Sequence, residues 1–275
     1  MSLFNRVAII GVGLIGGSIA LEIKNKRLAR EIVGVGRHKR NLSLAKKIRA
    51  IDKGSQDLKI IKDADLVILA TPVSSILNLA PQIARLIKPG CIVTDVGSTK
   101  KEIVSKLEKI FSRYVGSHPL AGSEKRGIDF ARPGIFKNSF CVLTPTKKTE
   151  KQALAKVRKL WASLGARVVD MTPASHDKIL SFVSHLPHIA AFSLIGAVPK
   201  ECLSFAPGGL RDTTRIAASD TEIWSDIFLS NQKNIIKAID LLQGNLTKIK
   251  SAIHNKNKKA LTAFLREAKQ KREIL

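Results

Sequence analysis

The stretch RVAIIGVGLIGGSIA, residues 6–20, decides the fold. The apolar run RVAII predicts a buried strand, and Gly11, Gly13 and Gly16 follow it before a helical pattern over 15–27. In such a series one glycine permits a tight turn, another lets the backbone approach a pyrophosphate, and the third lets helix and strand pack closely. Because the glycines lie between a predicted strand and a predicted helix, we expect a dinucleotide site rather than a turn without a ligand.

Strand and helix patterns alternate from this start to about residue 172. This alternation predicts an α/β fold with a doubly wound, largely parallel sheet and helices on both faces. Pro81 is expected to kink or split one of the helices. The predicted strands lie within 6–10, 31–36, 64–72, 88–98, 113–122, 139–146 and 166–173, and the further helices within 74–87, 99–111 and 149–164.

The pattern becomes purely helical beyond Met171. We therefore expect a Rossmann-type dinucleotide-binding domain over residues 1–172 and an all-helical domain over residues 173–275. The first helical stretch, 174–198, is apolar on most sides although it contains Pro187. A helix of this kind is buried in a bundle or in a subunit interface, so we expect the helical domain to form a homodimer.

Composition excludes several classes of protein. The chain has no run of 18 apolar residues, so we expect no membrane span. Its start, MSLFNRVAII, lacks the features of an export signal. The three cysteines, Cys91, Cys141 and Cys202, are scattered and form no CxxC pair. These features together predict a cytoplasmic protein without disulfides.

The net charge of +25 makes contact with anions an obvious question. The basic residues are spread along the chain, and aromatic residues make up only 5% of it. Single-stranded nucleic acids are bound by aromatic stacking beside basic grooves, so we do not expect nucleic acid as a partner. A positive field also favours small anionic substrates, which we expect instead.

The end of the second predicted strand bears on the choice of cofactor. NAD enzymes usually place Asp or Glu there, about 20 residues beyond the glycine series, to bind the ribose 2′-hydroxyl. Here GVGRHKRN contains no carboxylate, and Arg37, His38, Lys39 and Arg40 gather instead. A guanidinium pairs with a 2′-phosphate, so we expect NADP as the preferred cofactor, with Arg37 as its main contact. The alternatives are NAD, or an ordinary basic loop.

Two loops after later strands carry the residues best suited to catalysis. DVGSTK (95–100) and GSHPLAGSEKRG (116–127) come at the carboxyl ends of predicted strands, where open α/β sheets bind their ligands. His118 lies in a loop of Gly and Pro that holds a side chain at a fixed angle. We expect His118 to act as a general base toward a substrate hydroxyl while a hydride leaves, and Ser98 to orient its imidazole.

Histidines and arginines also cluster in the helical half. SHLPH places His185 and His188 one turn apart on one helix face. No third ligand accompanies them, so we expect a helix-packing pair and no metal.

A turn-rich stretch, GGLRDTTRIAASD, interrupts the predicted helices. It places Arg211 and Arg215 four residues apart, and their guanidinium groups suit recognition of a carboxylate. The alternative is a surface ion pair with Asp212 or Asp220.

In this order and spacing, the motifs resemble those of the prephenate/arogenate dehydrogenase family of tyrosine biosynthesis. The resemblance runs from the glycine series through DVGSTK, GSHPLAGSEKRG, SHLPHIAAF and GGLRDTTRIAASD to WSDI, nearly the whole chain. It implies a Rossmann-type domain, a helical dimerisation domain and an active site in the cleft. It also implies NAD(P)-dependent oxidative decarboxylation of prephenate to 4-hydroxyphenylpyruvate, or of arogenate to tyrosine.

The resemblance further implies roles for individual residues. His118 would take the proton of the ring hydroxyl as hydride leaves the ring carbon, and Ser98 would assist it and the nicotinamide end. Arg215 would bind a substrate carboxylate. The implied substrate pocket comprises Arg215, His188, His185, Glu124, Arg211 and Trp224, and the implied cofactor site comprises Gly11, Gly13, Leu14, Ile15, Gly16, Arg37, His38, Thr71, Pro72 and Ser98.

Some alternatives stay open. Another two-domain dehydrogenase, acting on a hydroxy acid or an imine, would use a lysine where this chain has SHLPH. A non-catalytic NADP-binding sensor would need neither His118 nor Ser98. Glu124 suits either an arogenate ammonium or an ionic gate over both substrates, and we favour prephenate. We expect no fused chorismate mutase segment before Phe4 and no regulatory domain after Leu275.

Overall fold

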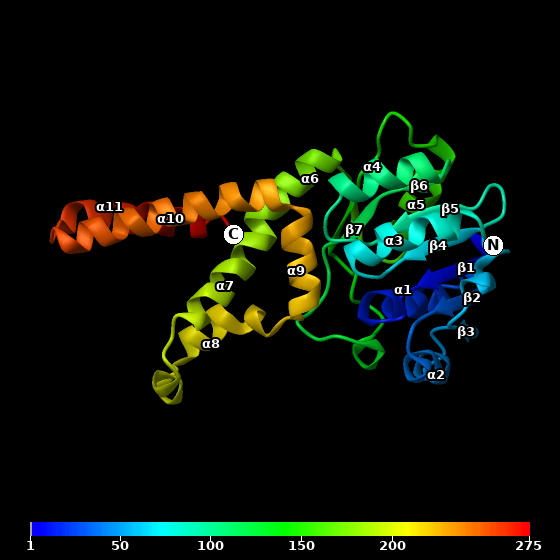
Figure 1. The fold of residues 1–275 in the computed structure, drawn as a ribbon, viewed down its shortest axis with the longest axis horizontal. Helices are drawn as coiled ribbons and strands as arrows, with labels where there is room; N and C mark the ends of the chain where they lie inside the picture. Colours follow the sequence, from blue (N-terminus) through cyan, green and yellow to red (C-terminus); the bar gives the residue numbers. More distant parts are fainter. Residues whose placement is uncertain (1) are drawn as a thin grey trace.

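A parallel six-stranded sheet, in the order β3-β2-β1-β4-β5-β6, forms the centre of the first half of the computed structural model, which describes residues 2–275 (Figure 1). The order reverses direction between β1 and β4, which is the switch point where such sheets open a crevice for ligands. The strands are β1 (Phe4–Ile10), β2 (Ala29–Val35), β3 (Lys53–Ser55), β4 (Leu66–Leu69), β5 (Ile92–Asp95) and β6 (Tyr114–Val115).

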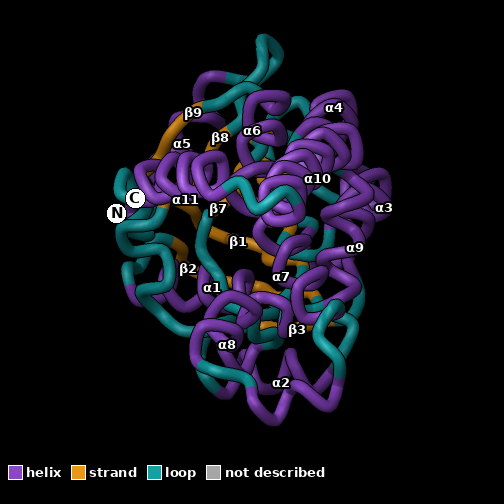
Figure 2. Tube along the Cα trace, turned by 90° about the vertical axis from the view of Figure 1, so that its left-hand side faces the viewer, coloured by secondary structure: helices purple, strands orange, loops and turns teal. Residues whose placement is uncertain are grey.

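Helices cover both faces of this sheet, as the alternation predicts. One buried cluster joins the sheet to α1, α2 and α5, and a second joins it to α3 and α4. Figure 2 shows these two sets on opposite sides of the strands. The helices are α1 (Leu14–Asn25), α2 (Lys39–Lys47), α3 (Val73–Ala84), α4 (Lys101–Ile110) and α5 (Lys151–Ser163), with short 3₁₀ turns at Leu58–Ile61 and Ile128–Phe130.

A second, mixed sheet departs from the expected parallel arrangement. It holds β7 (Ser117–Pro119), β8 (Phe140–Leu143) and β9 (Arg167–Asp170), and β7 runs antiparallel to β8. The chain leaves the first sheet after β6 and enters this one at Gly116. A Cβ on Gly116 would lie 2.3 Å from Thr144 Oγ1, so only glycine lets the two segments come this close.

The remainder of the described chain is helical. A continuous helical stretch runs from Pro173 to Gly196, and the helices α10 and α11 project away from the sheets as a hairpin (Figure 1). The elements are α6 (Pro173–Leu180), a π-helical turn (Ser181–His185), α7 (Leu186–Gly196), 3₁₀ turns (Lys200–Phe205, Arg215–Ala218), α8 (Gly208–Thr214), α9 (Thr221–Ser230), α10 (Gln232–His254) and α11 (Lys258–Arg272).

The stretch Pro173–Gly196 is long and apolar enough to cross a membrane, although no run of 18 apolar residues occurs in it. An 18-residue window within it has a mean hydropathy of 1.5, and only 22% of that window is buried within one copy of the chain. In α7, Ala191 is the one buried residue. This apolar surface therefore needs a cover that a single copy of the chain does not supply.

Two prolines affect their helices less than the sequence suggests. Pro81 lies inside α3, which is continuous. Pro187 is the second residue of α7, which begins directly after the π-helical turn. A proline ring clashes with the carbonyl four residues earlier, and the wider π turn relieves such a clash, so the long helix continues.

The stretch GGLRDTTRIAASD, which was expected to be turn-rich, forms α8 and a 3₁₀ turn, so that expectation was wrong.

Carboxylates of the helical half dock on helix ends of the sheet half. Asp177 of α6 accepts hydrogen bonds from the backbone N–H groups of Lys100 and Lys101, at 2.7 and 2.9 Å, at the start of α4. Asp226 of α9 accepts one from the N–H of Ser74, at 2.8 Å, at the start of α3. A carboxylate at a helix N-terminus satisfies unpaired N–H groups and complements the helix dipole. These two contacts fix the helical half against the edge of the sheet.

Candidate active site

The glycine series forms a close-packed turn that is open on one side. Gly11 has a φ of +98°, and a Cβ there would lie 2.3 Å from the carbonyl oxygen of Ala70. A Cβ on Gly16 would lie 2.1 Å from the carbonyl oxygen of Gly11. A Cβ on Gly13 would meet nothing within 4 Å. Gly11 and Gly16 therefore serve the packing of the turn, while Gly13 borders free space in front of α1.

The start of α1 is available to an anion. Its first residues are Leu14 and Ile15, and no side chain caps it. The starts of α3 and α4, by contrast, receive Asp226 and Asp177. Uncapped N–H groups at a helix N-terminus form a phosphate site.

Thr71 and Pro72 follow β4 on the other side of the crevice. The Oγ1 atom of Thr71 is buried without a hydrogen-bond partner within the described chain. A buried hydroxyl without a partner is costly, so this oxygen is suited to bind a ligand in the crevice. The uncapped N–H groups at the start of α1 and the hydroxyl of Thr71 together form a set of hydrogen-bond donors that fits a dinucleotide.

Basic side chains surround the end of β2. Arg37, His38, Lys39 and Arg40 are all exposed. Arg40 forms an ion pair with Asp129 at 3.5 Å, and its guanidinium remains largely exposed. The backbone carbonyl of Arg37 accepts a hydrogen bond from Gln56. The Arg37 side chain is exposed and has no hydrogen-bond partner within residues 2–275, so its guanidinium can turn toward a ligand.

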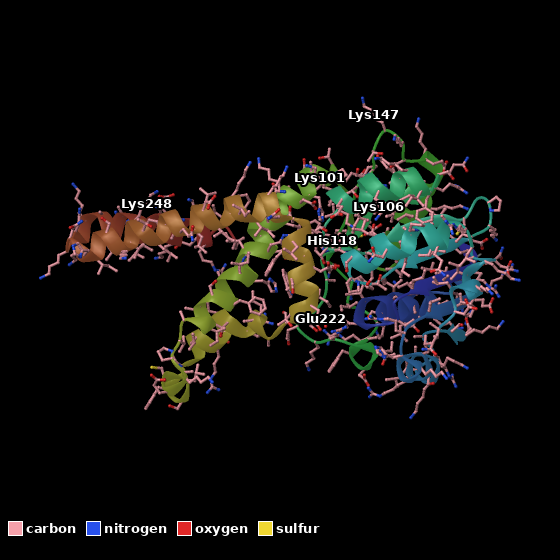
Figure 3. All side chains as sticks on the ribbon, in the orientation of Figure 1. Lys101, Lys106, His118, Lys147, Glu222 and Lys248 are labelled. Carbon is pink, nitrogen blue, oxygen red and sulfur yellow. The ribbon has the colours of Figure 1, made fainter. Side chains whose placement is uncertain are left out.

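His118 lies on β7 at the junction of the two halves (Figure 3). Its Nδ1 is 2.8 Å from Nε2 of His176, and Nδ1 of His176 is 2.8 Å from Oδ1 of Asp177. The Nε2 atom of His118 has no hydrogen-bond partner within residues 2–275. It is not fully buried, so it is accessible to a ligand. One ring nitrogen is thus held by the protein while the other faces outward.

The structure gives His118 a hydrogen-bond partner other than Ser98, which the sequence analysis expected. Ser98 is half-buried, and no hydrogen bond joins its hydroxyl to His118 in the part of the chain that the structure describes. The ring is held by His176 instead. Sequence reasoning passed over His176 and Asp177, although both belong to the segment that contains SHLPH. The adjacent His-Asp pair at the start of a helix was the available signal.

The surroundings of His118 favour its neutral form. Burial lowers its pKa well below the usual value, and the charges of His176, Lys100 and His185 act in the same direction. Burial also lowers the pKa of His176. Burial alone would raise the pKa of Asp177, but the hydrogen bonds from His176, Lys101 and Lys100 outweigh it and lower that pKa. Two neutral rings and a carboxylate result.

A fully buried ion pair lies beneath these groups. Lys100 donates to the carboxylate of Asp95 and, at 2.9 Å, to the carbonyl of Ser117, and both charged side chains are inaccessible. The hydroxyl of Tyr114 donates to Asp95 at 2.7 Å, and burial together with Asp95 raises the pKa of Tyr114 well above its usual value. This network fixes the ends of β5 and β6 and the start of β7, next to His118.

The helical half faces the junction with an aromatic pair. His188 stacks on Trp224, with ring centroids 3.5 Å apart, and its Nδ1 is 2.9 Å from the carbonyl of Ser184. His185 is buried and contacts Asn231 at 3.2 Å, and burial lowers its pKa to about 4. The two histidines therefore differ: His188 is partly accessible, whereas His185 is a packing residue behind it.

Two ion pairs connect the loop after β7 to the helical half. Arg215 forms an ion pair with Glu124 at 3.0 Å, and Arg126 pairs with Asp220. The partner of Arg215 is thus neither Asp212 nor Asp220, the residues weighed from the sequence. Arg211 lies on α8 and is exposed, without an ion pair in residues 2–275. Glu124 and Arg215 lie at the surface of the junction, in reach of solvent.

Residues 2–275 contain no group of three or more His, Cys, Asp or Glu side chains able to hold a metal ion. The expectation that the protein uses no metal stays a prediction.

The chain matches two family models that together span most of its length. Residues 19–170 match the nucleotide-binding domain of prephenate dehydrogenase, and residues 172–267 match its dimerization domain. The prephenate dehydrogenase of Bacillus subtilis is 36% identical over 280 residues, covering 98% of this chain and 76% of that protein. The cyclohexadienyl dehydrogenase of Zymomonas mobilis is 32% identical, covering 100% and 97%.

Solved structures agree with these matches. Prephenate dehydrogenase from Aquifex aeolicus, in complex with hydroxyphenyl propionate and NAD+, has a TM-score of 0.93 at 35% identity and covers 98% of this chain and 97% of that one. Arogenate dehydrogenase from Synechocystis has a TM-score of 0.82 at 30% identity, covering 98% of this chain and 99% of that one. The resemblance found in the sequence is confirmed, and the chain belongs to the prephenate dehydrogenase family.

Proposed function

We propose that this protein oxidatively decarboxylates prephenate to 4-hydroxyphenylpyruvate and prefers NADP+ over NAD+ as the hydride acceptor. One observation carries the proposal. His118 is a neutral imidazole, held at Nδ1 and accessible at Nε2, at the junction between a dinucleotide-binding sheet and the helical half.

The proposed cofactor site lies along the carboxyl edge of the first sheet. The N–H groups of Leu14, Ile15 and Gly16 would face the pyrophosphate in front of the uncapped α1. Thr71, Pro72 and Ser98 would line the nicotinamide end. Arg37 and His38, with no carboxylate among the four residues that follow Gly36, favour the 2′-phosphate of NADP. When bound, the nicotinamide accepts the hydride.

His118 then has two tasks. Its accessible Nε2 hydrogen-bonds the ring hydroxyl, which orients the substrate, and it takes the hydroxyl proton as the hydride departs from the same carbon. A carbonyl forms at that carbon, the bond to the ring carboxylate breaks, and CO2 leaves. The electrons of the broken bond complete the aromatic ring as a phenolate, which takes the proton back from His118 to give the phenol. The protein therefore has to orient the reactants and compensate charge but does not have to store electrons.

Arg215, on the helical side, is proposed to bind a substrate carboxylate, with His188 and Trp224 lining the pocket. Arg211 is a second cation on the same side, and His185 supports the pocket from behind. Glu124 lies 3.0 Å from Arg215 and would separate from it when a substrate carboxylate binds. We favour prephenate, which has a keto side chain, over arogenate, which has an amino group.

The remaining expectations are also proposals. We propose domains over residues 1–172 and 173–275, a homodimer formed through the helical half, a cytoplasmic location and catalysis without a metal. The match to a dimerization domain supports the dimer. The net charge of +25 supports a small anionic substrate.

A four-way assay tests the function. The protein is incubated with prephenate or arogenate, each with NADP+ or NAD+, and both nicotinamide reduction and the aromatic product are measured. We expect the highest kcat/KM for prephenate with NADP+, with 4-hydroxyphenylpyruvate as product. Tyrosine formed from arogenate at a higher kcat/KM would overturn the substrate choice. No reduction with any of the four pairs would overturn the function.

A further inference from the structure

We propose that His176 and Asp177 are positioning residues for His118, which fix its tautomer so that Nε2 is the basic atom. The inference rests on the proposed function, in which His118 is the base. It starts from two hydrogen bonds in series, each 2.8 Å long: His118 Nδ1 to His176 Nε2, and His176 Nδ1 to Asp177 Oδ1. His176 and Asp177 are buried, whereas His118 is half-buried.

The direction of each hydrogen bond follows from the carboxylate. An ionised Asp177 only accepts, so Nδ1 of His176 carries the proton. The neutral ring of His176 then has its lone pair on Nε2 and accepts from Nδ1–H of His118. His118, also neutral, is left with its lone pair on Nε2. The lowered pKa values of all three groups agree with these protonation states.

The carboxylate is itself held in place. Oδ1 and Oδ2 of Asp177 accept from the backbone N–H groups of Lys100 and Lys101, and Asn231 Nδ2 donates to the carbonyl of Asp177. His118 belongs to the sheet half, whereas His176 and Asp177 belong to the helical half. The base is therefore oriented by the docking of the two halves.

Other charged and titratable groups pack around this series. Lys100 is engaged by Asp95 and the carbonyl of Ser117, so it does not compete for His118. Tyr114 donates to Asp95, and His185 contacts Asn231. Cys141 on β8 is buried with a raised pKa and stays a thiol. Within the described chain, His176 alone forms a hydrogen bond with a ring nitrogen of His118.

The series also matters during proton transfer. The substrate hydroxyl proton moves to Nε2 of His118, and the ring becomes an imidazolium. Its Nδ1–H still donates to His176, and the charge of Asp177 lies at the far end of the series. A partner on the second nitrogen stabilises the imidazolium and prevents the ring from turning. No second proton has to move, and the substrate oxygen keeps the electrons of the O–H bond.

Nitrogen NMR of the full-length protein with isotopically labelled histidine tests the tautomer without any substrate. We expect His118 to show a protonated Nδ1 and an unprotonated Nε2, and His176 to show the same. The His118 resonances are assigned with His118→Asn. A His118 ring protonated on Nε2 would overturn the proposal.

Kinetics test whether the tautomer matters. His176→Leu removes the acceptor, and we expect kcat to fall by about 10- to 100-fold while KM and the cofactor Kd stay within about twofold. His176→Gln, which offers an acceptor near the same place, should recover much of the loss. His254→Gln, at the exposed end of α10, is the matched control and should leave kcat unchanged.

A double variant separates positioning from structural damage. In a His118→Asn background, His176→Leu should cause no further loss in kcat, because the residue it positions is gone. An additive loss would overturn the proposal, as would a normal kcat in His176→Leu. If His176→Leu does not fold, the NMR result and the His176→Gln variant decide. If the wild type oxidises neither prephenate nor arogenate, the proposed function fails, while the NMR result still decides the tautomer.

Discussion

At His118, burial and neighbouring charge act in the same direction. Both lower the pKa of the ring, so the neutral form persists to a lower pH than in a free histidine. A general base must be neutral, and activity is therefore lost as the pH falls through its pKa. From the sequence alone, the acid limb of the pH–activity profile would be expected near the unperturbed histidine pKa of about 6.5. Because the structure lowers the pKa of His118, we expect this acid limb at a lower pH.

The first prediction follows from this shift. A plot of kcat/KM against pH should be flat through neutrality, and its acid limb should lie clearly below about 6.5. His118→Asn keeps a hydrogen-bond donor but cannot take the proton, so it should lose this limb and about 10²- to 10⁴-fold in kcat. Cofactor affinity, measured by fluorescence titration, should change little. A limb above 6.5, or a normal kcat in the variant, would contradict the assignment.

Arg37 carries the second prediction. Replacing it with Asp removes a partner of the 2′-phosphate and supplies a partner for the 2′-hydroxyl, so the ratio of kcat/KM for NADP+ over NAD+ should fall by at least about tenfold. Arg30→Asp is the matched control, because Arg30 is exposed near the opposite end of the same strand, β2. A wild type that prefers NAD+ would already refute the choice of cofactor.

Arg215 carries the third prediction. Arg215→Ala removes a carboxylate contact that is present in the ground state and in the transition state alike, so KM for prephenate should rise by about tenfold or more with a smaller effect on kcat. Arg266→Ala on α11 is the control, since this arginine is exposed. A fall in kcat alone would show that Arg215 acts on the transition state instead.

At the level of elements, the glycines of the β1–α1 turn have different tasks: Gly11 serves packing, whereas Gly13 borders the space proposed for the cofactor. Gly13→Ala places its methyl group in free space, so the melting temperature should stay the same while the Kd for NADP+ rises by about tenfold or more, because the phosphate loses its close approach. Gly11→Ala combines a positive φ with a clash against Ala70, so it should destabilise the protein. Thermal melts and cofactor titrations distinguish the two. Equal Kd values for Gly13→Ala and wild type would place the phosphate elsewhere.

Much of the fold is visible in the sequence because its elements are strongly patterned. The apolar run Val7–Ile10 of β1 ends at Gly11, and the apolar strand β4 is followed shortly by Pro72, so both are easily seen in the sequence. The glycine series has one structural interpretation in that context. The sequence analysis missed α2 and β3. In α2 only Leu42 and Ala45 are buried, and β3 has three residues, so neither gives a clear periodic signal.

The site shows a sharper limit of sequence reasoning. His118 is recognisable from its loop, but its partner His176 is 58 residues away, on another element. The same holds for Asp177, which lies 77 residues from the N–H group of Lys100 that it binds. Local patterns predict where an element begins and which side it buries. They do not predict which side chains meet when two halves dock, because that depends on the packing of whole elements.

At the scale of the whole molecule, uncovered apolar surface stands out. Large exposed apolar side chains continue along the helical half, from α7 to the hairpin of α10 and α11 that projects from the sheets (Figure 1). Contiguous apolar patches of this kind mark an interface. The match to a dimerization domain indicates a second copy of the chain as the cover. The apolar stretch Pro173–Gly196 would then be covered by protein rather than by lipid.

The last prediction tests this cover. Light scattering at micromolar concentration should give the mass of a dimer for the wild type. Replacing Leu241 and Leu246 of α10, which are 60% and 57% exposed, by Lys places two charges on the interface and should shift the protein toward monomer. Phe140→Ser is the control, because this exposed residue lies on β8 in the sheet half and should leave the dimer intact. A monomeric wild type, or an undisturbed dimer in the double Lys variant, would show that α10 does not form the interface.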